Sequence, residues 1–306
     1  MKISLILTCF REAENIGGLI SDILSQSKLP DEMVVVDAGS PDETVSVLKS
    51  FETKFAERGT KLSIHVALGA SIAHGRNVAI GLASHEVIAV TDAGCRVDRN
   101  WLERITDPIF QGRADFVGGF FLPVTRNHFQ SILATLTTAK NPGPSFMPSS
   151  RSVAFCRRVW QGAGGYPEWL PWGEDTYFNQ RCLANGARYV VVDDAIVHWE
   201  VRRTWHQAVV QFRRYAFGDG LARRFSYSLA LAPIVYTLVI AGLVFGHSMA
   251  LALVPLLGAS WVFRKRGIKA KDGLYAICLA TSIQAARAYG YLGGLISSVG
   301  LKDVRK

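Results

Sequence analysis

The sequence predicts an α/β protein with a mostly parallel sheet, helices on both faces of that sheet, and apolar helices at its C-terminal end. Two observations predict the sheet. Short runs rich in β-branched residues alternate with helical patterns, and some of these runs end on a carboxylate. A third observation predicts the C-terminal part: residues 229–263 are 35 positions without Asp, Glu, Lys or Arg, enough for transmembrane helices.

Strands and helices alternate along the first hundred residues. Strand patterns cover 2–8, 32–36, 62–67 and 86–92, and helical patterns cover 14–26, 41–57 and 71–83. The helix at 41–57 has a recognisable start, because Ser40 suits the cap, Pro41 the first helical position and Glu43 the third. Alternation at this spacing predicts parallel strands joined by helices.

The pattern changes after residue 101. Strands are predicted at 115–122, 151–156, 188–192 and 196–198, and helices at 173–185 and 204–224. A segment rich in Pro, Gly and Ser, 141–150, is predicted to be a mobile loop. The sequence shows no internal repeat, so we expect one large domain over 1–222 and a membrane region over 223–306.

Two of the predicted strands are followed at once by functional side chains, because they end on Asp37 and Asp92. Ligands of open α/β sheets bind outside the carboxyl ends of the strands, so both carboxylates are expected at a ligand site. One carboxylate accepts the imide N–H of a uracil ring, and one beside Gly94 suits a metal ion on a diphosphate. The alternatives stay open: Asp92 can cap a following helix, and Asp37 can form a turn.

Charge and cysteine content argue against two classes of site. Residues 200–306 carry 15 basic and 4 acidic side chains, a net of +11, whereas residues 1–199 carry 19 and 21, a net of −2. The part with the strand-end carboxylates is therefore not basic, which argues against nucleic acid as a partner. The five cysteines are scattered without a C-x-x-C pair, which fits a reducing compartment without disulfide bonds or a zinc site.

A series of short motifs, in this order, resembles the inverting family-two glycosyltransferases, whose Rossmann-like fold is called GT-A. The resemblance covers about residues 1–222 and is specific in its combination rather than in any one motif. The motifs are Thr8-Cys9-Phe10-Arg11-Glu12, Asp37-x-x-Ser40-x-Asp42-x-Thr44, Gly75-Arg76-Asn77, Thr91-Asp92-Ala93-Gly94, Gly164-Gly165-Tyr166, Gly173-Glu174-Asp175-Thr176 and His198. The resemblance implies a catalytic domain with a nucleotide-sugar donor.

The resemblance also implies which residues bind that donor. They are Thr8, Phe10 and Asp37 for the nucleoside, Arg11 and Glu12 for the same pocket, Arg76 closing over the base or the diphosphate, and Asp92. A divalent metal, Mg²⁺ or Mn²⁺, is implied at Asp92 and His198, where it would be held through the diphosphate and water. Gly94 replaces the second acid of the family's D-x-D pattern, and Asp98 lies too far along the chain to fill that place.

The helix predicted at 173–185 would carry the catalytic base. Inverting transfer needs one base, opposite the leaving diphosphate, that takes the proton of the acceptor hydroxyl. The resemblance implies Asp175 as this base and Glu174 as the residue that orients it or the acceptor. The alternative is that both acids only favour a helix N-terminus.

Two residues are candidates for acceptor binding. Trp172 stands just before the two acids, and an aromatic face suits a sugar ring or a lipid-linked acceptor; a core position is the alternative. Arg214 belongs to Gln211-x-x-Arg214-Tyr215, which loosely resembles the Q-x-x-R-W signature of processive polysaccharide synthases. A basic helix face at a membrane surface is the alternative for Arg214.

Together these residues predict a membrane-attached glycosyltransferase that uses a UDP-sugar and a lipid-linked or cell-surface glycan acceptor. Basic residues flank the hairpin predicted at 225–263 on both sides, so the catalytic domain is expected in the cytosol. The helix predicted at 274–298 has Arg287 near its centre, so it is expected to lie in the cytosolic interface or to re-enter, with a third span as the alternative. A processive polysaccharide synthase and a non-catalytic scaffold subunit are the alternative functions.

Overall fold

The computed structural model describes residues 1–138, 142–143, 146–224 and 268–301. The hairpin predicted at 225–263 lies outside the described residues. The chain divides into two compact units, a first unit of residues 1–123 and 139–200 and a second unit of residues 124–138 and 201–306. The predicted boundary at residue 222, between a catalytic domain and a membrane region, was based on sequence motifs and not on compact units. It stays a prediction.

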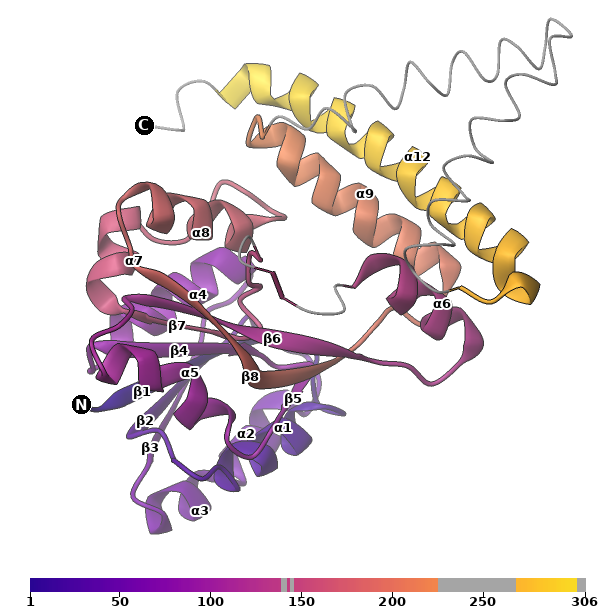
Figure 1. Ribbon diagram of the computed structural model, residues 1–306. Coiled ribbons are helices and arrows are strands. Elements are labelled where there is room, and N and C mark those ends of the chain that lie inside the picture. Colours follow the sequence, from indigo (N-terminus) through magenta and orange to yellow (C-terminus); the bar gives the residue numbers. More distant parts are fainter. Residues whose placement is uncertain (139–141, 144–145, 225–267, 302–306) are drawn as a thin grey trace, which may run out of the picture. The chain divides into compact units, whose positions relative to one another are not determined.

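An eight-stranded sheet forms the first unit, in the order β3-β2-β1-β4-β7-β6-β8-β5 (Figure 1). Its parallel part consists of β1 (Ile3–Cys9), β2 (Glu32–Asp37), β3 (Lys61–Val66) and β4 (Val87–Asp92). The strands β1, β2 and β4 are buried along almost their whole length, as expected of apolar runs covered on both faces. The prediction of alternating parallel strands is confirmed for this part.

The rest of the sheet is antiparallel where its pairing is known, so the expectation of a mostly parallel sheet was wrong for the second half. The strand β7 (Val153–Cys156) runs antiparallel to both β4 and β6 (Phe116–Val124). The strand β5 (Cys95–Val97) runs antiparallel to β8 (Tyr189–Glu200). A single strand β8 replaces the two predicted at 188–192 and 196–198, because its exposed Asp193 and Asp194 interrupt the apolar pattern without ending the strand.

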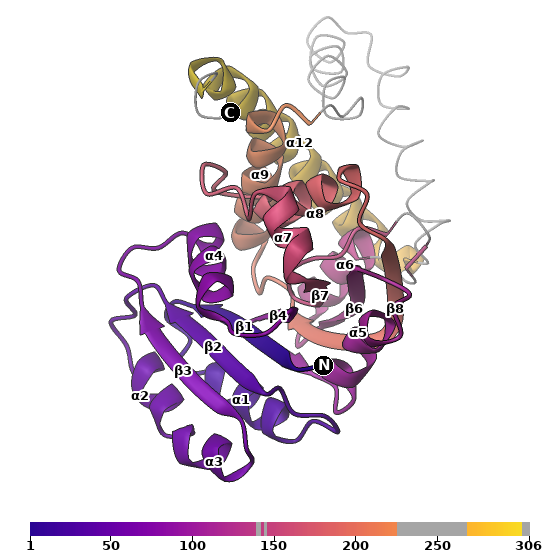
Figure 2. The same ribbon diagram turned by 90° about the vertical axis from the view of Figure 1, so that its left-hand side faces the viewer.

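Helices cover both faces of the parallel part, as predicted. Figure 2 shows α1 (Ile16–Leu24), α2 (Thr44–Lys49) and α3 (Glu52–Glu57) on one face and α4 (Ile72–Leu82) on the other. The helix predicted at 41–57 is therefore two short helices that begin at Thr44. Ser40 does not cap it, because the cap position is Glu43 and the Ser40 oxygen accepts instead from the Arg11 backbone N–H at 2.9 Å.

The first unit also contains α5 (Trp101–Phe110), α7 (Arg157–Ala163) and α8 (Glu174–Ala184). The helix α8 agrees with the one predicted at 173–185, whereas α5 and α7 were not predicted. The strand β5 follows directly after Asp92, so the alternative in which Asp92 caps a following helix is wrong.

The second unit is helical and contains α6 (His128–Thr137), α9 (Trp205–Leu221), α12 (Gly273–Ser297) and the short 3₁₀ helices η1 (Ala270–Asp272) and η2 (Ser298–Leu301). The long helices α9 and α12 lie side by side (Figure 1), and glycines allow their close approach. A Cβ on Gly220, Gly290 or Gly294 would lie 2.1 Å from a carbonyl oxygen of the other helix. In the described part of the chain, no helix is long and apolar enough to cross a membrane.

Candidate active site

The strand register brings the predicted donor-binding residues to one edge of the sheet. Thr8 lies opposite Asp92 of β4 and Val36 of β2, and Cys9 lies opposite Asp37. The strand β1 stands between β2 and β4, where the order of strands along the sheet changes direction. Ligands of open α/β sheets bind at such a point, outside the carboxyl ends of the strands. The prediction that Asp37 and Asp92 share this edge is confirmed.

A buried guanidinium joins β4 to α8 at this edge. Arg76 of α4 donates from Nη1 to Glu174 Oε1 at 2.7 Å and from Nη2 to Asp92 Oδ1 at 2.8 Å. The Arg76 side chain is only 2% exposed. Burial lowers the pKa of Arg76, but the charges of Asp92 and Glu174 outweigh it and raise the pKa above its ordinary value, so Arg76 stays charged. Arg76 is thus a bridge inside the protein, and its predicted closing over the donor stays untested.

The two acids that begin α8 have different surroundings. Both follow Gly173, which adopts the left-handed conformation at φ 77°. Glu174 points inward to Arg76, and burial, followed by the neighbouring Asp175 charge, raises its pKa above the ordinary value. Asp175 is half-buried, and its Oδ2 accepts from the Ser150 backbone N–H at 3.4 Å. Of the two, Asp175 is therefore the one placed to exchange a proton with a bound molecule.

Asn77, next to Arg76, fixes the loop before α8. Its Nδ2 donates to the Tyr166 carbonyl at 2.9 Å and to Glu168 Oε1 at 2.8 Å. Its Oδ1 accepts from the Tyr166 N–H at 2.9 Å and from Trp160 Nε1 at 3.0 Å. A Cβ on Gly165 would lie 3.0 Å from this oxygen, and Gly165 has φ 76°, so only glycine fits there without strain.

Tyr166 completes the connection between the motifs. Its ring stacks on Phe178 of α8 at 4.1 Å between centroids, and Arg76 Cζ lies 5.2 Å from its ring centroid. Its hydroxyl is 2.9 Å from the Ser150 hydroxyl. Three motifs that are far apart in the sequence, Gly75-Arg76-Asn77, Gly164-Gly165-Tyr166 and Gly173-Glu174-Asp175-Thr176, therefore form one packed structure around the guanidinium.

Asp37 acts as a turn-forming residue in this structure. Its Oδ2 accepts from the backbone N–H groups of Gly39 at 2.9 Å and Ser40 at 2.7 Å. Its Oδ1 accepts from the Ser40 hydroxyl at 2.5 Å and the Cys9 thiol at 3.4 Å, and the residue is fully buried. The alternative role of Asp37 as a turn former is therefore observed, and its contact with a nucleoside stays a prediction.

The other residues predicted for the nucleoside lie in the loop after β1. Phe10 is 50% exposed, and Arg11 Cζ lies 5.3 Å from its ring centroid. The backbone N–H of Arg11 donates to Ser40 Oγ at 2.9 Å, and that of Glu12 donates to Thr44 Oγ1 at 2.9 Å. This loop is therefore tied to the turn after β2, and it presents an aromatic face to which a base can stack.

The metal pair of Asp92 and His198 that the resemblance implies stays a prediction. His198 lies opposite Arg96 in the β5–β8 register, and its Nε2 is 2.7 Å from Asp98 Oδ1. Among the described residues, no three His, Cys, Asp or Glu side chains are grouped to hold a metal ion. The donor set, one carboxylate already bound to Arg76 and a glycine at 94, does not fit a metal site made by the protein itself.

Sequence motifs alone missed Arg151, whose Nε lies 3.9 Å from Asp92 Oδ2. The strand register contains the information that could have found it. Val153, the first residue of β7, lies opposite Val90 of β4 in antiparallel pairing. Extending that register by two residues beyond the strand puts Arg151 opposite Asp92. The direction of β7 had to be known first, and the sequence pattern does not give it.

The acceptor assignments stay predictions. Trp172 is half-buried and directly precedes Gly173, close in sequence to the two acids. Arg214 is exposed on α9, in the second unit, where Gln211 Nε2 of the same motif donates to the Tyr215 hydroxyl at 2.7 Å.

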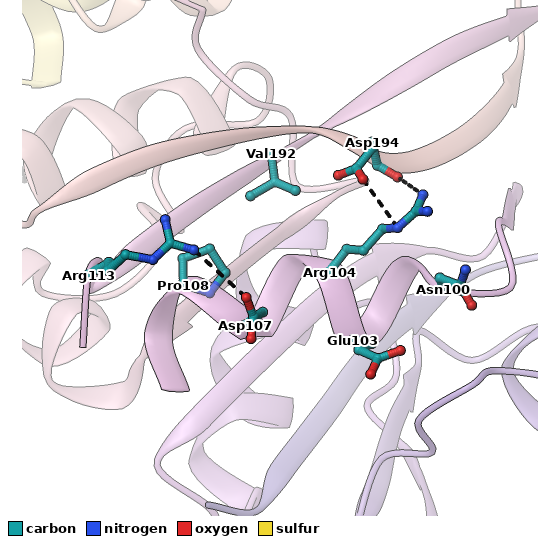
Figure 3. A pocket seen from close by; sticks show the side chains of 8 residues that line it. All are labelled: Asn100, Glu103, Arg104, Asp107, Pro108, Arg113, Val192 and Asp194. Atoms are coloured by element: carbon teal, nitrogen blue, oxygen red, sulfur yellow. Dashed lines mark hydrogen bonds and ion pairs between the residues drawn. The ribbon is translucent and has the colours of Figure 1, made fainter. Parts of the chain in front are cut away.

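A pocket of about 480 Å³ lies elsewhere, between α5 and β8 (Figure 3). Four of its charged side chains pair with one another: Arg104 with Asp194 at 3.3 Å and Arg113 with Asp107 at 3.7 Å. None of the predicted site residues lines this pocket. This pocket is thus separate from the candidate catalytic residues, which lie at the carboxyl edge of the sheet.

Comparisons with known proteins show what the sequence is similar to. Residues 4–156 match the family model of Glycosyl transferase family 2, and residues 87–270 match that of Glycosyl transferase family group 2. Glycosyltransferase AglE of Haloferax volcanii is 28% identical over 202 residues, which are 63% of this chain and 65% of that relative's length.

Two solved structures share the fold. Mannosyltransferase PcManGT from Pyrobaculum calidifontis, in complex with GDP-Man and Mn²⁺, has a TM-score of 0.69 at 18% identity, covering 99% of this chain and 88% of its own. TarS 1-349 of S. aureus, in complex with UDP-GlcNAc, has a TM-score of 0.53 at 18% identity, covering 98% of this chain and 92% of its own. At this identity the likeness shows the fold, a mixed α/β sheet of GT-A type.

The loop held by Asn77 should depend strongly on that side chain. We expect Asn77→Ala to lower the free energy of unfolding of the full chain by roughly 2–4 kcal/mol, because it leaves inward-facing donors unpaired. Urea denaturation followed by tryptophan fluorescence measures this change. Asn185→Ala is the matched control, since it removes one exposed hydrogen bond to the Gly162 carbonyl, at 2.7 Å, and should cost less than about 1 kcal/mol. Equal losses in the two variants would contradict the role of Asn77.

Proposed function

The chain belongs to glycosyl transferase family 2, and on that premise we propose that it transfers a sugar, with inversion, from a nucleotide-sugar donor to a glycan or lipid-linked acceptor. The observation that carries this proposal is the placing of Asp175 beside the buried Asp92–Arg76–Glu174 bridge at the carboxyl edge. The bound ligands of two proteins of the same fold, GDP-Man and UDP-GlcNAc, support a nucleoside diphosphate sugar as the donor. Uracil as its base is part of the proposal.

In the proposed reaction Asp175 takes the proton of the acceptor hydroxyl. The acceptor oxygen then forms a bond to the anomeric carbon, and the bond from that carbon to the diphosphate breaks with its electron pair on the diphosphate. Glu174, held by Arg76, fixes the first turn of α8 and thereby the position of Asp175. Mg²⁺ or Mn²⁺ carried by the donor's diphosphate stays a prediction, and we assign no step to it.

Asp175→Asn tests the base directly. The substitution keeps the shape of the side chain and removes its basicity, so nucleotide-sugar binding should persist while transfer falls by ~10²–10⁴-fold. A thermal-shift screen of nucleotide sugars identifies the donor, because a bound ligand stabilises the folded chain. Release of the nucleotide from that donor then measures the rate. Asp193→Asn, at an exposed position of β8, is the control and should keep the wild-type rate. A fast Asp175→Asn variant would move the assignment to Glu174.

We also propose that the second unit attaches the enzyme to a lipid bilayer on the cytosolic side. The described helix α12 exposes an uncharged face, formed by Leu274, Cys278, Tyr289, Leu292 and Ile296. Their spacing places them along one stripe of the helix. An apolar stripe of this kind suits the boundary between headgroups and acyl chains, and the uncharged run 229–263 precedes it in the chain.

Cys278 offers a native position for testing this attachment, because it is exposed whereas the other four cysteines are buried. A polarity-sensitive fluorophore on Cys278 should shift to the blue with anionic vesicles and be quenched by brominated lipid. The same label on Glu57→Cys, in a Cys278→Ser background, reports the first unit and should not respond. A label on Cys278 that stays in water in the presence of vesicles would refute the proposed membrane face.

A further inference from the structure

Arg151 lies at the carboxyl edge where the family's second metal-binding acid is missing. Its Nε is 3.9 Å from Oδ2 of Asp92, on the oxygen opposite to the one that Arg76 binds. Residue 94, two positions after Asp92, is a glycine and contributes no carboxylate. A cationic side chain therefore stands beside the carboxylate at which the resemblance implied a metal ion.

Neighbouring side chains hold the Arg151 guanidinium in place. Its Nη1 donates to Ser149 Oγ at 3.0 Å, and its Cζ lies 4.3 Å from the centroid of the Trp199 ring. The ring of Phe121 is 5.8 Å away. The side chain is 17% exposed, so it is neither free in solvent nor sealed in the core. A cation held against aromatic rings in this way loses little further conformational entropy when it binds an anion.

The need to neutralise the charge of Asp92 does not by itself explain why the Arg151 cation lies here. Arg76 already binds Asp92 at 2.8 Å, whereas the 3.9 Å between Arg151 and Asp92 is longer than a hydrogen bond. Asp92 therefore orients Arg151 electrostatically without taking a hydrogen bond from it. A planar guanidinium with several N–H donors matches phosphate oxygens and binds them through paired hydrogen bonds.

We propose that Arg151 binds the diphosphate of the nucleotide-sugar donor, with Asp92 and Trp199 holding its guanidinium in position. Its side chain thereby supplies positive charge to the leaving diphosphate. A metal ion bound to a second acid would otherwise supply that charge. This inference rests on the proposed function in one respect, namely that the donor carries a diphosphate. It adds the residue that recognises this group.

Inorganic pyrophosphate is the probe, because it carries the diphosphate without a base or a sugar. Calorimetric titration of the full chain in EDTA should show binding to the wild type. Arg151→Met keeps a stem that can pack on Trp199 but removes the charge, and it should weaken binding by about 10-fold or more. Arg151→Lys keeps the charge but loses the paired N–H donors, so it should weaken binding less than Arg151→Met does. Arg158→Gln, at an exposed arginine paired with Asp115, is the matched control and should bind as the wild type does.

Three results would overturn the inference. Equal affinity of Arg151→Met and the wild type would remove Arg151 from the diphosphate site. Equal losses in the methionine and lysine variants, with a lowered melting temperature in both, would make Arg151 a packing residue. Binding by the wild type only after Mn²⁺ is added would return the role to a metal ion. If no nucleotide sugar is turned over while pyrophosphate binding still depends on Arg151, the proposed function fails, whereas Arg151 remains a diphosphate-binding residue.

Discussion

The carboxyl edge of the sheet depends on one buried guanidinium, that of Arg76. It is hydrogen-bonded on one side to Asp92, which ends β4, and on the other to Glu174, which begins α8. Charges this deeply buried are stable only when paired, and loss of one partner of such a pair typically costs about 3–5 kcal/mol. The bridge therefore fixes the distance between the carboxyl end of β4 and the helix that carries Asp175.

The same bridge determines how charge is distributed in the site. Asp92 and Glu174 neutralise Arg76, so its charge acts within the protein, and a second cation is needed to attract an anionic donor. Arg151, the proposed diphosphate ligand, is such a cation, beside the second oxygen of Asp92 and against the Trp199 ring. Asp175 stays apart from the bridge, half-buried at the first turn of α8. Binding of the leaving group and proton transfer are thus assigned to different residues whose positions depend on Arg76.

The sequence predicted what depends on local pattern and missed what depends on distant partners. Continuous apolar runs located β1, β2 and β4, and thereby placed Asp37 and Asp92 at one edge. Ser40 failed as a helix cap because its oxygen accepts from the backbone N–H of Arg11, 29 residues earlier, and the helix begins only at Thr44. The partners of Arg76 lie 16 and 98 residues away, and no local pattern specifies them. The antiparallel direction of β7 was likewise invisible, so Arg151 could not be placed beside Asp92.

A double-mutant cycle at positions 76 and 174 tests the central role of the bridge most directly. Arg76→Met, Glu174→Gln and the double variant are compared with the wild type by their free energies of unfolding in urea. Because Arg76→Met alone leaves Glu174 charged and buried without a cation, we predict that it costs at least about 1 kcal/mol less in the Glu174→Gln background. Effects that add within about 0.5 kcal/mol would show that the two residues act independently and would contradict the bridge.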